Sequence, residues 1–370
     1  MHALPERRHT DARTDYDALP GMGWTVSMPV HPAPAVPHTR LPRARAQALL
    51  RHSGNPSAYL ALNEDTCHFT VPGFDGFIPY RQHGRFLFQL GGCFGAPAAR
   101  GPLLEGFRWF ARQQQCRICA VQLQEEDIAL YQSHGFSINQ MGTAYTIDVR
   151  HFSPMGSRFA KLRNKVSQAR RAGISVVELG VDAPRSDQDW LALASISRAW
   201  LAARGGQARL AGFMVGETGQ PGDLERRVFV AQRAGRAVGF ISFVPVHGAR
   251  PGLLHDLARR APDAPPGVMD LVNLTAIARF QREGIAHLHF GLAPFAGLNA
   301  QRDCVAGRNW LLGQLARTIY RHGAFLYPAR QQEHYQRKWH PHYAQPEYVG
   351  FEGGVSLAGL GRLVQLASRA

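Results

Sequence analysis

The sequence predicts an α+β protein built from two similarly organised domains, each with a mixed, mostly antiparallel sheet flanked by helices. The chain has 370 residues, more than one ordinary domain needs, and 45% of them are hydrophobic, which is enough for a sizeable core. Short alternating segments typical of strands are followed by segments with helical spacing, and this order of elements occurs twice.

The first 42 residues are rich in proline and have no periodic apolar pattern, so we expect them to form a disordered arm. Residues 43–150 are predicted to form the first domain. A short helix over 43–52 begins it, and alternation then predicts strands over 57–62, 67–71, 76–81 and 85–92. A helix over 102–114, a strand over 116–123, a helix over 126–135 and a strand over 144–149 complete it.

Residues 151–370 are predicted to repeat that order as the second domain, after a basic helix over 158–172. The expected elements are a strand over 174–179, a helix over 187–204, a hairpin over 226–246 that turns at Ala234–Gly235, a strand over 253–260, a helix over 268–284, a strand over 285–294 and a helix over 310–322. This order of strands and helices occurs twice, and it is the order expected for two GNAT-like (N-acyltransferase) domains in tandem.

The composition indicates an acidic partner. The formal net charge is +15, and arginine carries almost all of the positive charge, because lysine occurs only at Lys161, Lys165 and Lys338. Arginine pairs two phosphate oxygens at once, so the excess favours nucleic acid or an anionic membrane surface over the alternative of an arginine-rich genome. The sequence contains no apolar run long enough for a membrane span and no signal-peptide pattern. We therefore expect a cytoplasmic location, with peripheral membrane contact left open.

Cysteine and histidine do not indicate a metal site. The five cysteines are too few for a disulfide framework, and Cys116–Cys119 has no second CxxC at zinc-ribbon spacing. His287 and His289 share one face of a predicted strand, but no third ligand accompanies them. We expect ordinary thiols, packed histidines and no metal, with His289 a candidate for the wall of a pocket.

The phosphate-binding loop of an acetyltransferase is not recognisable. A GNAT enzyme holds acyl-CoA with a Q/R-x-x-G-x-G/A loop at a helix N-terminus, where free N–H groups bind pyrophosphate. Neither half has a clean copy of that loop. This favours an acyl donor other than acyl-CoA and predicts no bound cofactor.

The second half has the denser set of polar residues within apolar sequence. The loop GETGQPG (216–222) is able to expose backbone N–H groups. Further on, Asp256 lies in LLHDLARR, and Asp270 and Asn273 lie in the first turns of a predicted helix. The segment YPARQQEHYQRKW places three charged residues on one helical patch: Glu333, Arg337 and Lys338.

Six segments of the chain resemble the C-terminal synthase domain of phosphatidylglycerol lysyltransferases and alanyltransferases. They are KLRNKVSQARRAGI, RLAGFMVGETGQPGDLE, GFISFVPVHGARPGLLHDLARRAPDAPPGVMDLVN, HLHFGLAPF, LYPARQQEHYQRKW and PEYVGFEGGVSL. The resemblance covers roughly residue 50 to the end of the chain. It implies a tandem GNAT fold and transfer of an amino acid from aminoacyl-tRNA to a lipid hydroxyl, so the cognate aminoacyl-tRNA synthetase is an indirect partner.

Two departures from the family bear on the acceptor. The family's large transmembrane half has no counterpart in this sequence, and QMGTAYTIDV (140–149) stands where an acidic G-E-E-A type segment is usual. A stand-alone chain is similar to the valanimycin-type seryl-tRNA-dependent transferase, which belongs to antibiotic biosynthesis. We therefore expect seryl transfer to a hydroxyl or hydroxylamine group of a small molecule, with lysyl or alanyl transfer to phosphatidylglycerol at the membrane surface as the alternative.

Ester exchange is close to thermoneutral, so the enzyme needs to orient its reactants, take a proton from the acceptor and stabilise an oxyanion. Asp256 is the candidate for the acceptor-side acid–base or orienting role, beside Arg259 or Arg260. Asp270 is the candidate for holding the donor's α-ammonium, and Lys338 for a contact with the terminal adenosine phosphate or the oxyanion. Other predicted substrate contacts are Glu217, Asn273, His289 and Glu333, and the predicted tRNA contacts are Lys161, Arg163, Lys165, Arg170 and Arg171.

Each assignment has a structural alternative. The alternative for Asp256 is an ion pair with a nearby arginine, and for the basic helix it is a solvated surface; function is favoured over both. For Asp270 and Asn273, capping of a helix is an equal alternative. Two further hypotheses for the whole chain are a nucleic-acid-binding module on an inactive GNAT fold and a CoA-dependent acetyltransferase.

Overall fold

The computed structural model describes residues 39–203, 214–298, 329–354, 359 and 362. The strands are β1 (Cys67–Phe69), β2 (Gly76–His83), β3 (Phe86–Leu90), β4 (Phe94–Gly95), β5 (Arg117–Leu123), β6 (Phe136–Asp148), β7 (Ile174–Glu178), β8 (Arg227–Arg233), β9 (Arg236–Val246), β10 (Gly252–Arg260), β11 (His287–Pro294) and β12 (Tyr343–Glu352). The α-helices are α1 (Arg43–Leu50), α2 (Pro97–Gln113), α3 (Ile128–Ser133), α4 (Ala160–Arg171), α5 (Asp187–Ala202), α6 (Val268–Arg282) and α8 (Ala329–Arg337). The short 3-10 helices of the described ranges are η1 (Ala58–Leu62), η2 (Glu125–Asp127) and η3 (Ser157–Phe159).

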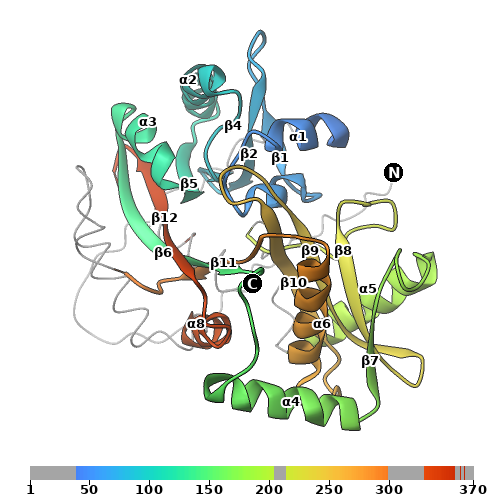
Figure 1. Ribbon diagram of the computed structural model, residues 1–370. Coiled ribbons are helices and arrows are strands. Elements are labelled where there is room, and N and C mark those ends of the chain that lie inside the picture. The colour runs from blue at the N-terminus through green and yellow to red at the C-terminus, as the bar shows by residue number, and fades with distance from the viewer. Residues whose placement is uncertain (1–38, 204–213, 299–328, 355–358, 360–361, 363–370) are drawn as a thin grey trace, which may run out of the picture. The chain divides into compact units, whose positions relative to one another are not determined.

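The strands form one mixed sheet in the order β1-β2-β3-β5-β12-β6-β11-β10-β9-β8-β7, with β4 beside β2 (Figure 1). The parallel pairs among the described strands are β3 with β5 and β10 with β11. Parallel neighbours need a crossover connection, and α2 and α6 supply it. The same unit, an antiparallel run that ends in a helix-linked parallel pair, thus occurs in both halves. The predicted α+β, GNAT-like fold class is confirmed.

The C-terminal strand β12 lies between β5 and β6, in the sheet of the first half. The sequence prediction assigned no strand to this segment. The long strand β6 pairs with β12 along most of its length and with β11 over Gly142–Asp148. The two halves are therefore joined by β6, which pairs with strands of both halves, and by β12, a strand from the end of the chain that lies in the sheet of the first half. The domain boundary at residue 150 stays a prediction.

Several predicted elements differ from the structure. The segment 57–62 was expected to be a strand, but Ala58–Leu62 forms the 3-10 helix η1, in which all five side chains are buried. Continuous apolar sequence does not distinguish a buried strand from a buried helical turn. The chain at Thr39 already accepts a backbone hydrogen bond from His68 at 2.7 Å, so ordered contacts begin before residue 43. Residues 1–38 of the predicted arm and the helix over 310–322 lie outside the described residues.

Local chemistry explains where the elements around the second half begin and turn. Ser186 and Asp189 form a capping box at the start of α5. Ala234 and Gly235 both have positive φ, as a two-residue hairpin between β8 and β9 requires. Helix α6 begins after Gly267, which is left-handed, and α4 packs against this end of α6 (Figure 1).

One of the hydrophobic clusters spans both halves. It joins Leu49 of α1 and Phe88 of β3 to Val244 of β9 and Leu292 of β11. Because this core crosses the junction, the polar residues that border it are held in place by both halves.

Candidate active site

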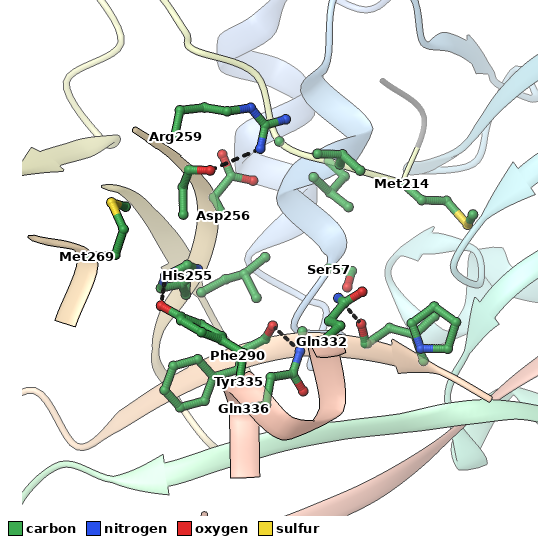
Figure 2. A pocket seen from close by; sticks show the side chains of 18 of the residues that line it. Ser57, Met214, His255, Asp256, Arg259, Met269, Phe290, Gln332, Tyr335 and Gln336 are labelled. Atoms are coloured by element: carbon green, nitrogen blue, oxygen red, sulfur yellow. Dashed lines mark hydrogen bonds between the residues drawn. The ribbon is translucent and has the colours of Figure 1, made fainter. Parts of the chain in front are cut away.

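A cavity of about 500 Å³ lies at this junction. The first half contributes η1 and the end of β5, and the second half contributes β10, β11, α8 and the segment Met214–Gly216 (Figure 2). Its polar lining residues are Ser57, Gln122, His255, Asp256, Arg259, Arg260, Gln331, Gln332, Tyr335 and Gln336. Aliphatic and aromatic side chains, among them Leu254 and Phe290, complete the wall. Such a mixture of apolar wall and few polar groups is typical of a small-molecule site.

Asp256, the predicted acid–base residue, lines this cavity. Its side chain is 1% exposed and forms an ion pair with Arg226, and Ser242 donates to its Oδ2 at 3.4 Å. Burial raises the pKa of Asp256, and the Arg226 guanidinium partly offsets that effect. Oδ1 has no hydrogen-bond partner among the described residues. The carboxylate is thus anchored through one oxygen and has acceptor capacity on the other.

Arg226 continues this ion pair into the first half. Its Nε donates to Asp223 at 3.2 Å, and Asp223 accepts from Tyr59 at 2.8 Å and from Arg43 at 2.7 Å. The position of Asp256 therefore depends on α1 and η1 as well as on the sheet of the second half.

Arg259 and Arg260 both line the cavity, but the arginine that pairs with Asp256 is Arg226. The Arg259 guanidinium stacks on the Trp200 ring at 3.9 Å and donates to its neighbour's carbonyl. Asp256 lies at the register shift between His255 and Leu257, where the regular alternation of β10 is interrupted. The arginine that forms the ion pair with Asp256 is therefore one that the sequence did not single out.

Asp270 and Lys338 form an ion pair with each other, outside the lining of the cavity. The Lys338 ammonium lies 4.0 Å from the centre of the Tyr335 ring, and burial lowers the pKa of Lys338. The predicted role of Asp270 as receptor of a donor ammonium is not favoured by this arrangement, because Lys338 already occupies its carboxylate.

Asn273 and His255 both hold the Tyr335 hydroxyl. Asn273 Nδ2 donates to it at 2.7 Å. His255 Nε2 lies 3.5 Å from it, as Figure 2 shows. Burial lowers the pKa of His255 to about 4, so this imidazole is neutral at physiological pH. Asn273 thus acts through Tyr335, and Tyr335 and His255 are the members of the group that line the cavity.

Three predicted substrate contacts lie away from the lining. His289 is packed between Thr146 Oγ1 at 2.9 Å and the Arg250 carbonyl at 3.0 Å, and burial lowers its pKa to about 4. Glu333 accepts from Tyr145 at 3.1 Å and pairs with Arg337. Glu217 lines a second cavity of about 380 Å³ and accepts from the Glu64 amide at 2.8 Å.

The basic helix α4 presents four exposed cations: Lys161, Lys165, Arg170 and Arg171. Arg163 differs from them, because its Nη1 donates to the carbonyls of Pro154 at 2.9 Å and Gly156 at 2.6 Å. The predicted phosphate contact of Arg163 is therefore not favoured, and its hydrogen bonds fasten the loop before the helix.

Among the described residues, no three histidine, cysteine or acidic side chains are placed to hold a metal ion. Cys116 and Cys119 are buried free thiols at the start of β5. The described part of the chain also contains no helix with the length and apolar character needed to cross a membrane.

Several cavity residues are not among those predicted from the sequence. Gln122 lies in the apolar run of β5, and Ser57 lies in a segment predicted as a strand, so neither had a signal of its own. Arg226 did have one, since a charged residue directly before an apolar strand and after a glycine-rich loop is unusual. Tyr335 lies three residues before Lys338 on the predicted helix, so helical spacing alone could have placed the two side by side.

The repeated unit and the cavity between its copies define a tandem GNAT-like acyltransferase fold. The sequence pattern of the family described as "Phosphatidylglycerol lysyltransferase, C-terminal" matches residues 45–351. This chain belongs to that family.

The relatives agree with this assignment. The phosphatidylglycerol lysyltransferase of Bacillus subtilis is 24% identical over 321 residues, which cover 86% of this chain and 36% of the relative. The protein of the same name from Staphylococcus epidermidis is 23% identical over 326 residues, 87% of this chain and 37% of the relative. The chain thus spans about a third of the length of these relatives.

Solved structures show the same fold. The C-terminal domain (DUF2156) of an Agrobacterium fabrum protein superposes with a TM-score of 0.69 at 21% identity, covering 87% of this chain and 94% of the other. L-PGS from Bacillus licheniformis gives a TM-score of 0.67 at 22% identity, covering 88% and 97%.

Proposed function

We propose that this protein transfers an aminoacyl group from aminoacyl-tRNA to a hydroxyl of phosphatidylglycerol. The observation that carries the proposal is the family match over 45–351, which contains every element of the cavity around Asp256. The relatives are named for a lipid acceptor, so the lipid takes precedence over the small-molecule acceptor that the sequence analysis put first. Seryl transfer in antibiotic biosynthesis has no supporting observation of its own.

Asp256 is the group that activates the acceptor in this proposal. Arg226 holds its Oδ2, which leaves Oδ1 as the oxygen to accept a hydrogen bond from the attacking hydroxyl. Burial raises its pKa, which makes the carboxylate a stronger proton acceptor than a solvated one. Because the tRNA ester is already activated, orientation and proton transfer account for the rate, with about 7–11 kcal/mol available from orientation.

The surroundings of α6 favour tRNA over CoA as donor. In the GNAT-like plan the N-terminus of the helix after the parallel strand is the anion site. Here the Lys165 carbonyl occupies the position that a Cβ on Gly267 would take, so α4 backbone lies against that helix end. Helix α4 carries four exposed cations. Its Lys165 lies close enough to Lys338 to lower the pKa of Lys338. This placement favours the predicted contact of Lys338 with a phosphate over one with the oxyanion.

The test uses the purified chain, aminoacyl-tRNAs labelled separately in their lysyl, alanyl and seryl groups, and vesicles with or without phosphatidylglycerol. The proposal is supported if label enters the organic phase only when phosphatidylglycerol is present. Digestion of the aminoacyl-tRNA with ribonuclease before the reaction should abolish this transfer. Asp256→Asn is expected to lower the rate by at least about a hundredfold. The matched control is Asp263→Asn, an exposed carboxylate whose partner Arg236 lies 3.8 Å away, and it is expected to keep the wild-type rate.

Three results contradict the proposal in different ways. Label that moves into a water-soluble product restores the small-molecule acceptor. Tight tRNA binding without loss of any ester supports a nucleic-acid-binding module, and turnover of acetyl-CoA supports an acetyltransferase.

A further inference from the structure

Glu347 on β12 is a carboxyl group wholly inside the protein. It is 0% exposed, and neither of its oxygens has a hydrogen-bond partner among the described residues. An ionised carboxylate in such a place is strongly disfavoured, since nothing replaces its hydration. A native structure therefore contains a compensating arrangement around it.

The neighbours that act on this carboxyl are the side-chain amides of Gln122 and Gln124. Gln122 also lines the cavity, and its Nε2 donates to Ser57 Oγ, another lining atom, at 3.1 Å. The other amide atom, Oε1, is buried and without a partner in the described structure. The Glu347 carboxyl and Gln122 Oε1 thus both lack partners in the part of the chain that the structure describes, and the Gln122 side chain that acts on the carboxyl also lines the cavity.

The backbone at Gln122 supports a functional placement. Its φ is +57°, in the left-handed region that non-glycine residues seldom adopt. The register between β5 and β12 shifts nearby, between Tyr348 and Gly350. Irregularities of this kind redirect a side chain out of the regular pattern, and they concentrate at functional sites.

We propose that Glu347 stays protonated and that its carboxyl O–H donates a hydrogen bond to Gln122 Oε1. The resulting chain of hydrogen bonds makes the Ser57 hydroxyl a donor toward the cavity. The carboxyl O–H satisfies Gln122 Oε1, Gln122 Nε2 satisfies Ser57 Oγ, and the Ser57 proton is left for a ligand. The ligand atom is then an acceptor, such as an ester, phosphate or hydroxyl oxygen. Glu347 is a positioning residue in this scheme, which rests on the proposed function for the identity of the ligand.

Ionisation of Glu347 reverses the direction of the chain. A carboxylate accepts hydrogen bonds only, so the Gln122 amide turns its Nε2 to Glu347 and its Oε1 to Ser57. Ser57 then donates to Gln122 and presents only lone pairs to the cavity. One proton on a buried acid thus decides whether the cavity wall donates or accepts at this point.

Burial raises the pKa of Glu347 to about 8, and the two glutamine amides lower it by less than burial raises it. The titratable groups on the neighbouring elements are Arg117 and Cys119 on β5, Tyr145 and Asp148 on β6, and Glu125, Glu126 and Asp127 on η2. None of them is among the described groups that shift this pKa. The transition is therefore expected slightly above neutral pH.

The first test is the pH profile of transfer to phosphatidylglycerol vesicles. Wild-type kcat/KM is expected to fall at least about fivefold between about pH 7 and about pH 9. In Glu347→Gln, the amide N–H replaces the carboxyl O–H, so the rate at neutral pH is kept within about twofold and this decline is lost. A decline of equal size in Glu347→Gln overturns the proposal.

Ser57→Ala tests the other end of the chain without altering Glu347. It is expected to lower kcat/KM at neutral pH by about five- to tenfold and to remove the same decline. The matched control is Ser133→Ala, an exposed serine on α3, which is expected to keep both the rate and the profile. A rise in KM for the tRNA assigns the Ser57 contact to the donor, and a rise in KM for the lipid assigns it to the acceptor. A Ser57→Ala profile identical to wild type overturns the proposal.

An infrared measurement separates this inference from the proposed function, because it needs no substrate. At neutral pH the wild-type spectrum is expected to contain a protonated-carboxyl C=O band that Glu347→Gln lacks and that disappears as the pH rises past about 8. No such difference band means that Glu347 is ionised, and the inference then fails. If the band is present while wild type transfers no label at any pH, the proposed function fails and the assignment of the proton stands.

Discussion

Arg226 reaches across β9 to form an ion pair with Asp256 on β10, and both side chains are buried, at 3% and 1% exposure. On the way it donates to Ser242 of β9 at 3.2 Å. Arg226 also pairs with Asp223, so one guanidinium compensates two buried carboxylates. The cavity acid is thus held by a charge network that belongs to the fold as much as to the site.

Replacement of Arg226 is expected to destabilise the protein strongly. Arg226→Met leaves the buried Asp256 carboxylate without a cation and leaves Asp223 with Arg43 alone, and removal of one partner of a buried pair costs about 3–5 kcal/mol. Urea denaturation measures this loss. Arg236→Met, at an exposed pair, is the control, with an expected change below about 0.5 kcal/mol. Equal stability of the two variants would show that the buried network is not stabilising.

Gly216 is expected to tolerate no side chain. A Cβ at this position would overlap the Asp256 carboxyl group, so Gly216→Ala displaces either the carboxylate or the loop. We expect transfer to fall at least about tenfold, since small misplacement of a reacting group is costly. Gly222→Ala in the same loop meets no atom within 4 Å and is expected to behave as wild type. The rate of label transfer checks both variants.

The exposed cations of α4 are expected to bind tRNA in a salt-dependent way. Each of Lys161→Ala, Lys165→Ala and Arg170→Ala should lower the slope of log K against log salt by about 0.7–0.9 if it removes one phosphate contact. Filter binding over a range of salt concentrations measures the slope. Arg163→Ala should leave the slope unchanged and lower the unfolding midpoint instead, because its guanidinium fastens a loop. The reverse pattern would reject α4 as the RNA-binding surface.

Glu347 is expected to make the protein less stable as the pH rises. Its pKa is raised from 4.5 to about 8 in the folded state, so between these values the unfolded chain releases a proton that the folded chain retains. Unfolding is therefore favoured increasingly up to about pH 8, and the penalty near pH 7 is on the order of 3 kcal/mol. Glu347→Gln should remove this dependence and gain about 2–3 kcal/mol near pH 7, with little gain below about pH 4.5.

Urea denaturation at several pH values checks this prediction, with Glu105→Gln on the exposed face of α2 as control. A gain in stability that does not vary with pH would mean that the pKa of Glu347 is the same in the folded and unfolded states.

Sequence alone determined the elements of this protein and their order, because helices and strands follow from the spacing of apolar residues within one segment. The twofold order, the hairpin at Ala234–Gly235 and the basic helix were all predictable in this way. The LLHDLARR segment also had a signal, since charged residues are unusual within an apolar strand, and the structure places Asp256 of this segment in the lining of the cavity.

Tertiary structure decided which residues meet. Arg226 pairs with Asp256, Lys338 with Asp270, and Glu347 lies behind Gln122, although 30, 68 and 225 residues respectively separate the partners in sequence. The insertion of β12 between β5 and β6 creates the last of these contacts. Long-range strand pairing has no local signal, because it depends on the summed burial and hydrogen bonding of the whole sheet. For this reason the cavity's chemistry became assignable only when the strands were in place.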